Sequence, residues 1–136
     1  MIVADASVIV DMLLGPGSEA GDALADRFAR AEAVCVPHLI DAEVPQVLRR
    51  FVLRGALPGY VGEALVNDLT ALPFHRYAHS SLVARAFQMR ANVTVYDGLY
   101  LALAEGLDCP LLTGDSALAG VPGCHAVVEV LSTSRS

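Results

Sequence analysis

Residues 95–115 read VYDGLYLALAEGLDCPLLTGD and combine one helix with one strand. The helix is expected to begin at Asp97, which has the position of an N-cap, and to end before Gly106. The apolar run 110–113 is typical of a buried strand, and Asp115 follows it closely. This stretch therefore places one carboxylate at the start of a helix and another beyond the end of a strand.

The segments before and after this stretch repeat the same alternation. Short β-branched runs are followed by longer segments in which apolar residues recur about every 3.6 positions, a pattern typical of βα units. The strands that it predicts lie at 1–4, 34–36, 74–77, 110–113 and 126–130, with 93–96 as a further strand or an extended turn. The predicted helices lie at 7–14, 18–31, 39–54, 57–72, from 79 or 80 onward, 97–105 and 116–119. The pattern indicates the α/β class, with a central parallel sheet and helices on both faces.

The length and the apolar content favour one domain over residues 1–136. A chain of 136 residues with 54% hydrophobic residues is long enough to bury a sizeable core. The longest uncharged stretch, 116–128, is shorter than the roughly 18 apolar residues of a membrane span. No basic residue precedes Arg27, and Asp5 interrupts the apolar start, so a secretory signal is not expected. We therefore expect a cytoplasmic protein without a membrane segment.

The charged residues and the cysteines exclude several classes of function. The chain has 15 acidic and 9 basic residues, which argues against binding nucleic acid through a wide basic surface but not against cutting it. All the basic residues are arginine, so phosphate-loop NTPases, Schiff-base enzymes and phosphoacceptor receiver domains, which need a lysine, are excluded. Cys35, Cys109 and Cys124 form no C-x-x-C pair, and we interpret them as small core residues.

Four acidic residues lie beside apolar sequence, where burial or a strand end is expected: Asp5, Glu43, Asp97 and Asp115. Asp5 and Asp115 follow predicted strands and Asp97 follows the 93–96 run; an open parallel sheet binds its ligands beyond such carboxyl ends. Glu43 lies near the apolar stripe of its helix rather than on the solvated face. We expect the four carboxylates to share one pocket, although Asp5 and Asp97 could each cap a helix instead.

Four carboxylates in one pocket need a cation. Like charges at close range raise one another's pKa values unless positive charge keeps them ionised. Oxygen ligands select Mg²⁺ or Mn²⁺ over Zn²⁺, and no cluster of Cys or His argues otherwise. Such a site suits phosphodiester hydrolysis, because the metal lowers the pKa of a bound water and neutralises charge on the scissile phosphate.

Two hydroxyl residues accompany these carboxylates. Ser7 and Thr113 each lie two residues from an aspartate, a spacing suited to orienting a ligand or a metal-bound water, although helix capping is the common role of such residues. We interpret the other aspartates of interest as helix-surface or loop charges: Asp11, Asp41, Asp68 and Asp108.

Three arginines follow Glu43 within two turns of the same predicted helix: Arg49, Arg50 and Arg54. A guanidinium group at this place can bind a phosphate through two hydrogen bonds, so these residues are candidates for RNA binding. The structural alternative is a solvated helix end, where cations interact favourably with the helix dipole.

Three blocks of the chain resemble a known family in order and spacing. They are MIVADASVIVDMLL at 1–14, VPHLIDAEVPQVLRR at 36–50 and the stretch 95–115. Together they resemble the PIN-domain ribonucleases and, within that family, the VapC toxins of bacterial toxin-antitoxin pairs. The resemblance assigns the four carboxylates to the family's acidic quartet and assigns Ser7 and Thr113 to its hydroxyl positions.

The resemblance implies a PIN-like three-layer α/β/α fold and a specific activity. It implies a Mg²⁺-dependent endoribonuclease, with Mn²⁺ as a substitute, that cleaves tRNA or ribosomal RNA and so inhibits translation. It also implies a homodimer that shapes an RNA groove and a VapB-like antitoxin that inhibits the toxin and regulates the operon.

Two residues depart from the family pattern. Gln46 stands three residues after Glu43, where the family commonly has Asn; its longer amide is a candidate, with Ser7 and Thr113, for supporting the metal ligands. Pro45 is expected to kink the helix. A haloacid-dehalogenase-like phosphatase, with Asp5 as nucleophile, is an alternative, but Ser7 replaces its second aspartate and its lysine is missing. A catalytically silent PIN-like binding module is the other alternative, and the four intact carboxylates argue against it.

Overall fold

A computed structural model describes residues 1–134, and the last two residues of the expected 1–136 domain lie outside this range. A five-stranded sheet forms the centre, and every neighbouring pair of its strands is parallel. Its order is β3-β2-β1-β4-β5, with the strands at Ile2–Ala4 (β1), Val34–Pro37 (β2), His75–Tyr77 (β3), Leu111–Thr113 (β4) and Val128–Val130 (β5). The three central strands are buried along their whole length, which explains their continuous apolar sequences.

Six α-helices and two 3₁₀ turns connect the strands in the described part of the chain. The helices are Ala6–Leu13 (α1), Glu19–Ala29 (α2), Ile40–Leu53 (α3), Gly59–Ala71 (α4), Val83–Gln88 (α5) and Val95–Leu107 (α6). The 3₁₀ turns are His79–Ser81 (η1) and Ser116–Leu118 (η2).

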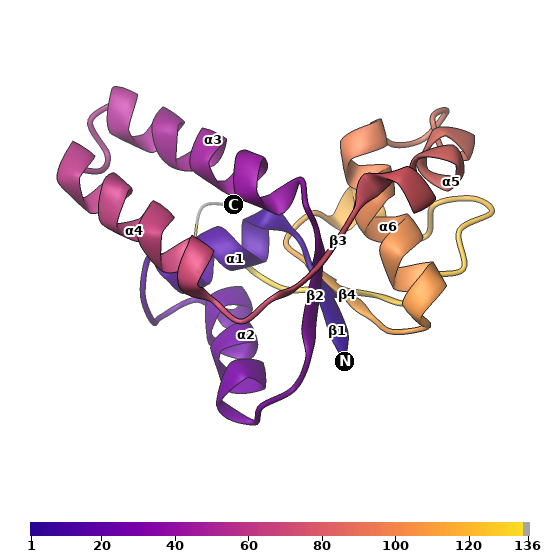
Figure 1. The fold of residues 1–136 in the computed structure, drawn as a ribbon, viewed down its shortest axis with the longest axis horizontal. Helices are drawn as coiled ribbons and strands as arrows, with labels where there is room; N and C mark the ends of the chain where they lie inside the picture. The colour runs from indigo at the N-terminus through magenta and orange to yellow at the C-terminus, as the bar shows by residue number, and fades with distance from the viewer. Residues whose placement is uncertain (135–136) are drawn as a thin grey trace.

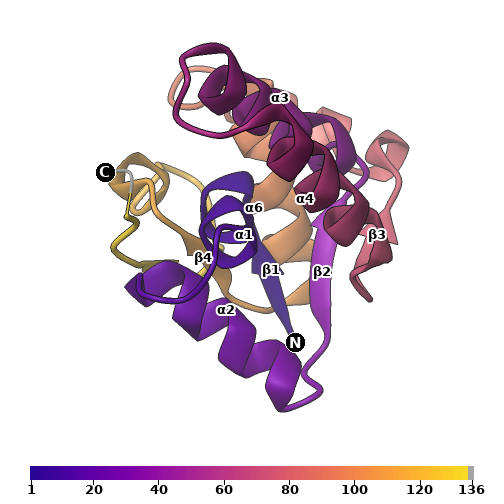
Figure 2. The same ribbon diagram turned by 90° about the vertical axis from the view of Figure 1, so that its left-hand side faces the viewer.

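The order of the strands places the helices on both faces of the sheet. The chain moves from β1 through β2 to β3 in one direction and then returns to β4 on the other side of β1. Because parallel crossovers are right-handed, α1 to α4 cover one face, whereas α5 and α6 cover the other. Figures 1 and 2 show these two groups of helices on either side of the sheet. The predicted α/β/α architecture is confirmed.

The start and the end of α6 differ from the prediction. Thr94 is the N-cap, and its side chain accepts a hydrogen bond from the backbone N–H of Asp97 at 3.1 Å. Residues 93–96 therefore form no strand, and Asp97 lies in the first turn of the helix rather than capping it. At the other end, Asp108 takes the left-handed conformation (φ 50°), and the helix continues past Gly106. A threonine cap and an aspartate in the left-handed region were both available locally but are less common choices than those predicted.

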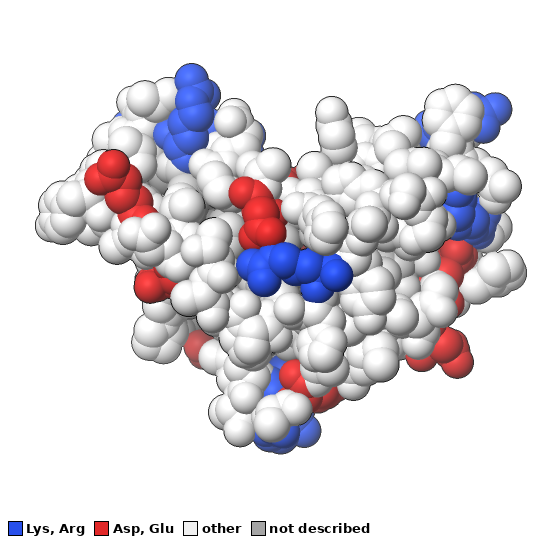
Figure 3. Space-filling view, viewed as in Figure 1, with Lys and Arg blue, Asp and Glu red and all other residues white. Residues whose placement is uncertain are grey.

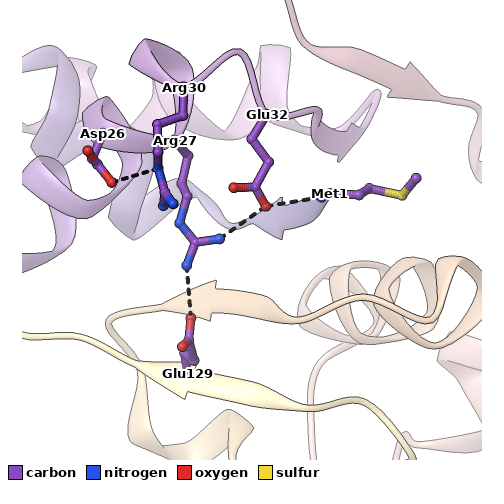
Figure 4. Close-up of polar contacts among 6 residues, drawn as sticks. All are labelled: Met1, Asp26, Arg27, Arg30, Glu32 and Glu129. Atoms are coloured by element: carbon purple, nitrogen blue, oxygen red, sulfur yellow. Dashed lines mark hydrogen bonds and ion pairs between the residues drawn. The ribbon is translucent and has the colours of Figure 1, made fainter.

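An ion-pair network joins α2 to the edge of the sheet. Arg27 lies 3.2 Å from Glu32 and 3.7 Å from Glu129 of β5, and Glu32 also pairs with the terminal amine of Met1 at 3.0 Å (Figure 4). The network joins the N-terminus and α2 to β5 and contains none of the four candidate carboxylates. Because its charges are partly exposed, it adds modestly to stability and has no role in the candidate site.

Helices α3 and α4 form one arm of the molecule. Helix α3 continues through Pro45, and its Leu48 side chain is buried. An open groove of about 830 Å³ runs between the two helices, lined mainly by apolar side chains together with Arg49 and Glu63. Among the described residues, no helix has the length and apolar character needed to cross a bilayer.

Asp11 is not the surface charge that the sequence suggested. It is buried in α1, where its carboxylate accepts hydrogen bonds from the backbone N–H (2.8 Å) and the hydroxyl of Ser134. The C-terminal segment therefore packs against α1. Periodicity could not show this because the partner lies at the far end of the chain.

Candidate active site

The ends of β1 and β4 create the centre of the site. These strands are neighbours, with Ala4 opposite Leu112, so the residues that follow them emerge at the same edge of the sheet. Asp5 follows β1 directly and caps α1, whereas Asp115 follows β4 and caps η2. The sheet is built outward in opposite directions from β1 and β4, and the helices of the two halves lie on opposite faces. The carboxyl ends of β1 and β4 are therefore the topological switch point, where open α/β sheets bind ligands.

Asp5 is the most buried of the four carboxylates, with 7% of its surface exposed. One oxygen accepts hydrogen bonds from the Ser7 hydroxyl at 2.6 Å and from the Val8 N–H at 3.3 Å, and the other accepts from the Thr113 hydroxyl. Burial raises the pKa of Asp5, although these three hydrogen bonds oppose the rise, and the negative charge of Asp97 raises it further. Both Asp5 oxygens are therefore held in place by the protein.

Ser7 and Thr113 connect the two strand ends. The Ser7 hydroxyl oxygen accepts the Gly114 N–H at 2.9 Å, and the Thr113 hydroxyl oxygen accepts the Asp115 N–H at 3.0 Å. Both hydroxyls donate to Asp5, so Thr113 serves the distant carboxylate as well as the adjacent one. The structure thus gives the two hydroxyl residues of the sequence analysis a shared role in orienting Asp5.

Glu43 and Asp97 approach this edge on α3 and α6. Helix α3 follows β2, and α6 runs back toward the start of β4, so the N-terminal turns of both helices lie at the carboxyl edge of the sheet. Burial raises the pKa of Glu43, and the charges of Asp97 and Asp5 add to the rise. Burial also raises the pKa of Asp97, and the charge of Asp115 adds to it. Asp97 therefore interacts electrostatically with each of the other three carboxylates, and Asp5 also interacts with Glu43.

The surface of the molecule is hollowed between the arm formed by α3 and α4 and a second arm formed by α5 and α6. Figure 3 shows a notch between α3 and α4 on one side and α5 and α6 on the other, with arginine side chains toward both outer ends. Glu43 and Asp97 belong to the arms that flank this notch.

The carboxylate oxygens of the candidate site are suitable ligands for a hydrated divalent cation. Within residues 1–134, no three carboxylate, imidazole or thiolate side chains lie close enough to form a compact ligand cluster. Mg²⁺ usually keeps several of its waters and takes only one or two protein carboxylates, so it does not need such a cluster. A cation here would also offset the repulsion that raises the pKa values of Asp5, Glu43 and Asp97.

The three candidate arginines of α3 have different surroundings. All are exposed, but only Arg50 of the three is near enough to lower the pKa of Glu43, which lies two turns earlier on the same face. Arg49 lines the groove toward α4, and the Arg54 guanidinium lies 4.5 Å from the centre of the Phe51 ring. The structure therefore brings Arg50 toward the site and directs Arg49 and Arg54 elsewhere.

Two polar residues near Glu43 are separate from the carboxylate cluster. Gln46 is exposed on α3, and no side-chain hydrogen bond of the described residues involves it. Asp41 forms a two-point ion pair with Arg76, with N···O distances of 2.7 and 3.0 Å, which attaches the first turn of α3 to β3. Asp41, which the sequence analysis interpreted as a helix-surface charge, is thus a structural residue that pairs with Arg76.

Sequence reasoning gave Tyr100 no role in the site, but the structure places it beside Glu43. Its hydroxyl donates a hydrogen bond to Glu43 Oε1 at 2.6 Å, and its ring is buried. The available signal was the spacing of three residues from Asp97, which puts both side chains on one face of α6. That spacing is equally typical of a core tyrosine, so it could not identify the partner.

Comparison with known proteins agrees with this geometry. The model of the PIN domain matches residues 2–123. The chain is 43% identical over 131 residues to ribonuclease VapC1 of Mycobacterium tuberculosis, covering 95% of this chain and 96% of that protein. It is 39% identical over 132 residues to VapC12 of the same organism, covering 97% and 100%.

Among solved structures, VapBC2 of Rickettsia felis bound to a promoter DNA fragment superposes with a TM-score of 0.69 at 13% identity. That match covers 97% of this chain and the whole of the other, and it shows a shared fold. The PIN domain is a metal-dependent nuclease fold, in agreement with an acidic site at the switch point of the sheet. The chain therefore belongs to the PIN-domain family, among the VapC ribonucleases.

Proposed function

We propose that this chain is a Mg²⁺-dependent endoribonuclease that acts in the cytoplasm as the toxin of a toxin-antitoxin pair. The observation that carries the proposal is the placement of Asp5, Glu43, Asp97 and Asp115 at the carboxyl edge of the sheet, where burial and neighbouring carboxylates raise the pKa values of Asp5, Glu43 and Asp97. Without a cation, repulsion between these carboxylates lowers the stability of the folded protein. A cluster of like charges that is kept despite this cost indicates a functional site. The family supports RNA as the substrate.

The four carboxylates are proposed to hold the Mg²⁺ ion together, some directly and the others through its bound waters, and Mn²⁺ can substitute. When bound, the cation lowers the pKa of a coordinated water and neutralises charge on the scissile phosphate. Asp5 is oriented by Ser7 and Thr113 through both of its oxygens. Asp97 and Glu43 lie on α6 and α3, the helices that flank the notch, so the scissile phosphate is proposed to lie between these helices. The negative site residues would repel an anionic substrate, and a bound cation would offset that repulsion.

The RNA is proposed to lie across the notch. Arg50 is the arginine of α3 that lies nearest to the carboxylates, and its guanidinium group can bind a backbone phosphate. Because the chain has a net charge of -6, local arginines rather than the overall charge must supply the attraction. Structured targets such as tRNA or ribosomal RNA fit this arrangement, and their cleavage would inhibit translation.

The partner is proposed to be a VapB-like antitoxin. The groove between α3 and α4 is open, largely apolar and about 830 Å³ in volume, and the exposed side chain of Tyr60 lies on it. An amphipathic segment of an antitoxin would bury this groove, and Arg49 and Glu63 offer polar contacts at its border. A homodimer is also proposed, since the family is expected to shape its RNA groove from two subunits.

The test is cleavage of total bacterial RNA by the purified protein. We expect discrete new 5′ ends with Mg²⁺ or Mn²⁺, none with EDTA, and a loss of more than about 100-fold in rate for Asp5→Asn. The matched control is Asp68→Asn, the same change at an exposed position of α4, which should cleave as wild type does. Folded wild-type protein that leaves RNA intact but hydrolyses a phosphate monoester would instead support the phosphatase alternative.

A further inference from the structure

Tyr100 links the two arms that flank the notch. It lies on α6 with 1% of its surface exposed, yet its hydroxyl reaches Glu43 of α3 at 2.6 Å. A buried tyrosine hydroxyl needs a hydrogen-bond partner, and here that partner is a carboxylate of the candidate site. Tyr100 therefore packs as a core residue and also forms a direct hydrogen bond with a residue of the candidate site.

The position of Tyr100 on α6 couples two carboxylates. Tyr100 follows Asp97 by three residues, so both side chains lie on the same face of the helix, about one turn apart. Helix α6 is itself held close to α5, since a Cβ on Gly98 would lie 3.0 Å from the Ala86 carbonyl oxygen. One rigid helix thus presents Asp97 directly and holds Glu43 through the tyrosine hydroxyl.

Glu43 needs such a contact more than the other carboxylates do. Its long side chain has several rotatable bonds, and the charges of Asp97 and Asp5 repel it. Without a hydrogen-bond donor inside the protein, the Glu43 carboxylate would lower its energy by turning toward solvent, where water hydrates it and the other carboxylates are farther away. Arg50 offers attraction, but it is exposed and lies two turns along α3. The Tyr100 hydroxyl is the donor that the structure shows at hydrogen-bond distance.

We propose that Tyr100 is a positioning residue that holds Glu43 in the orientation needed to bind the divalent cation. The inference rests on the proposed function, because it assigns Glu43 to the metal site. Because Tyr100 has only 1% of its surface exposed, we expect its effect on the reaction to pass through Glu43 rather than through contact with RNA. Loss of the hydroxyl should therefore weaken metal binding and turnover while leaving RNA binding unchanged.

The test compares wild type, Tyr100→Phe and the control Tyr77→Phe. Tyr77 is a half-buried tyrosine of β3 whose hydroxyl lies 4.0 Å from the Cys35 thiol and not near a carboxylate. For Tyr100→Phe we expect about 10-fold weaker Mn²⁺ binding by titration calorimetry and about 10-fold lower kcat, with KM for RNA within about twofold. Tyr77→Phe should match wild type in all three quantities. A Tyr100→Phe protein with wild-type Mn²⁺ affinity and kcat would overturn the positioning role.

A second comparison in EDTA tests the contact without the metal. Tyr100→Phe should lower the urea midpoint of unfolding in wild type, but it should leave the midpoint unchanged or raise it in a Glu43→Ala background, where the hydroxyl has lost its partner. An equal decrease in both backgrounds would show that the hydroxyl acts independently of Glu43 and would overturn the inference. Folded wild type that neither binds Mn²⁺ nor cleaves RNA would instead refute the proposed function, and the positioning role with it.

Discussion

The carboxylates of the site are held in positions that oppose their ionisation. Asp5 is buried, and Glu43 and Asp97 are partly buried among like charges, so the pKa of each is raised. A carboxyl group with a raised pKa in the folded state adds stability below its unfolded pKa and loses it as the pH rises through the folded value. At neutral pH without metal, these residues therefore destabilise the fold.

Asp97→Asn should consequently stabilise the metal-free protein while abolishing cleavage. The amide keeps the volume and removes the charge that repels Asp5 and Glu43. We expect a gain on the order of 1 kcal/mol in the free energy of unfolding at pH 7 in EDTA, shrinking toward zero near pH 4. Urea unfolding at both pH values measures it, with Asp68→Asn as the exposed control. An unchanged or lowered stability at pH 7 would contradict the electrostatic account.

Thr113→Val should damage the site through two hydrogen bonds. Thr113 is fully buried, donates to Asp5 and accepts from the Asp115 N–H. Valine keeps the shape but leaves both groups short of a partner, which we expect to cost about 1–3 kcal/mol of stability and about 10–100-fold in cleavage rate. Thr70→Val, which removes an exposed hydroxyl on α4, is the control. Equal effects of the two substitutions in unfolding and cleavage assays would refute this role for Thr113.

Among the helices, α5 and α6 behave as one unit. Arg85 of α5 forms two hydrogen bonds with Glu105 of α6, at 2.8 and 2.9 Å, and a third with the Gly123 carbonyl oxygen. Glu105 also accepts the His125 N–H at 2.7 Å. This cluster attaches the far end of α6 to α5 and to the loop before β5, so the turn that carries Asp97 rests on a fixed support.

Glu105→Gln should weaken this unit in a pH-dependent manner. The hydrogen bonds from Arg85 lower the pKa of Glu105 to about 2, so its contribution is present above the unfolded pKa and is lost as the pH falls through the folded value. We expect the substitution to cost about 1–2 kcal/mol at pH 7 and progressively less below pH 4.5. Urea unfolding from pH 7 to pH 3 measures the difference from wild type. A constant difference across this range would contradict the ion-pair origin, and the exposed Glu63→Gln provides the baseline.

Over the whole molecule, the repulsion at the site makes stability depend on the cation. A ligand that binds the folded state stabilises it by mass action, and these carboxylates must be ionised to bind Mg²⁺. We expect 10 mM Mg²⁺ to raise the melting temperature relative to EDTA by a few degrees, about 1 kcal/mol, at pH 7.5 and by less at pH 5. The Asp97→Asn protein should show a much smaller rise. A melting temperature insensitive to Mg²⁺ at both pH values would argue against a metal site.

The order of residues along the chain was sufficient for the class of fold, and it pointed to four carboxylates as candidate site residues. Short apolar runs and 3.6-residue periodicity are local patterns, and they indicated the five strands and the parallel sheet, together with a strand or turn at 93–96 that proved not to be a strand. Asp5 and Asp115 were recognisable because a carboxylate directly after a buried strand has a defined place at the sheet edge. The roles of the four carboxylates in catalysis stay predictions, as do those of Ser7, Thr113 and Gln46.

Contacts between distant segments were decided only by the tertiary structure. Tyr100 meets Glu43 across 57 positions of the chain, and Thr113 meets Asp5 across 108, so no local pattern contains either pair. All three arginines of α3 follow Glu43 in the sequence, but of the three only Arg50 lowers the pKa of Glu43 in the structure. The chemistry and spacing of side chains can be identified from the sequence. Which two distant buried groups form a pair depends on the elements that the strand order of the sheet brings together.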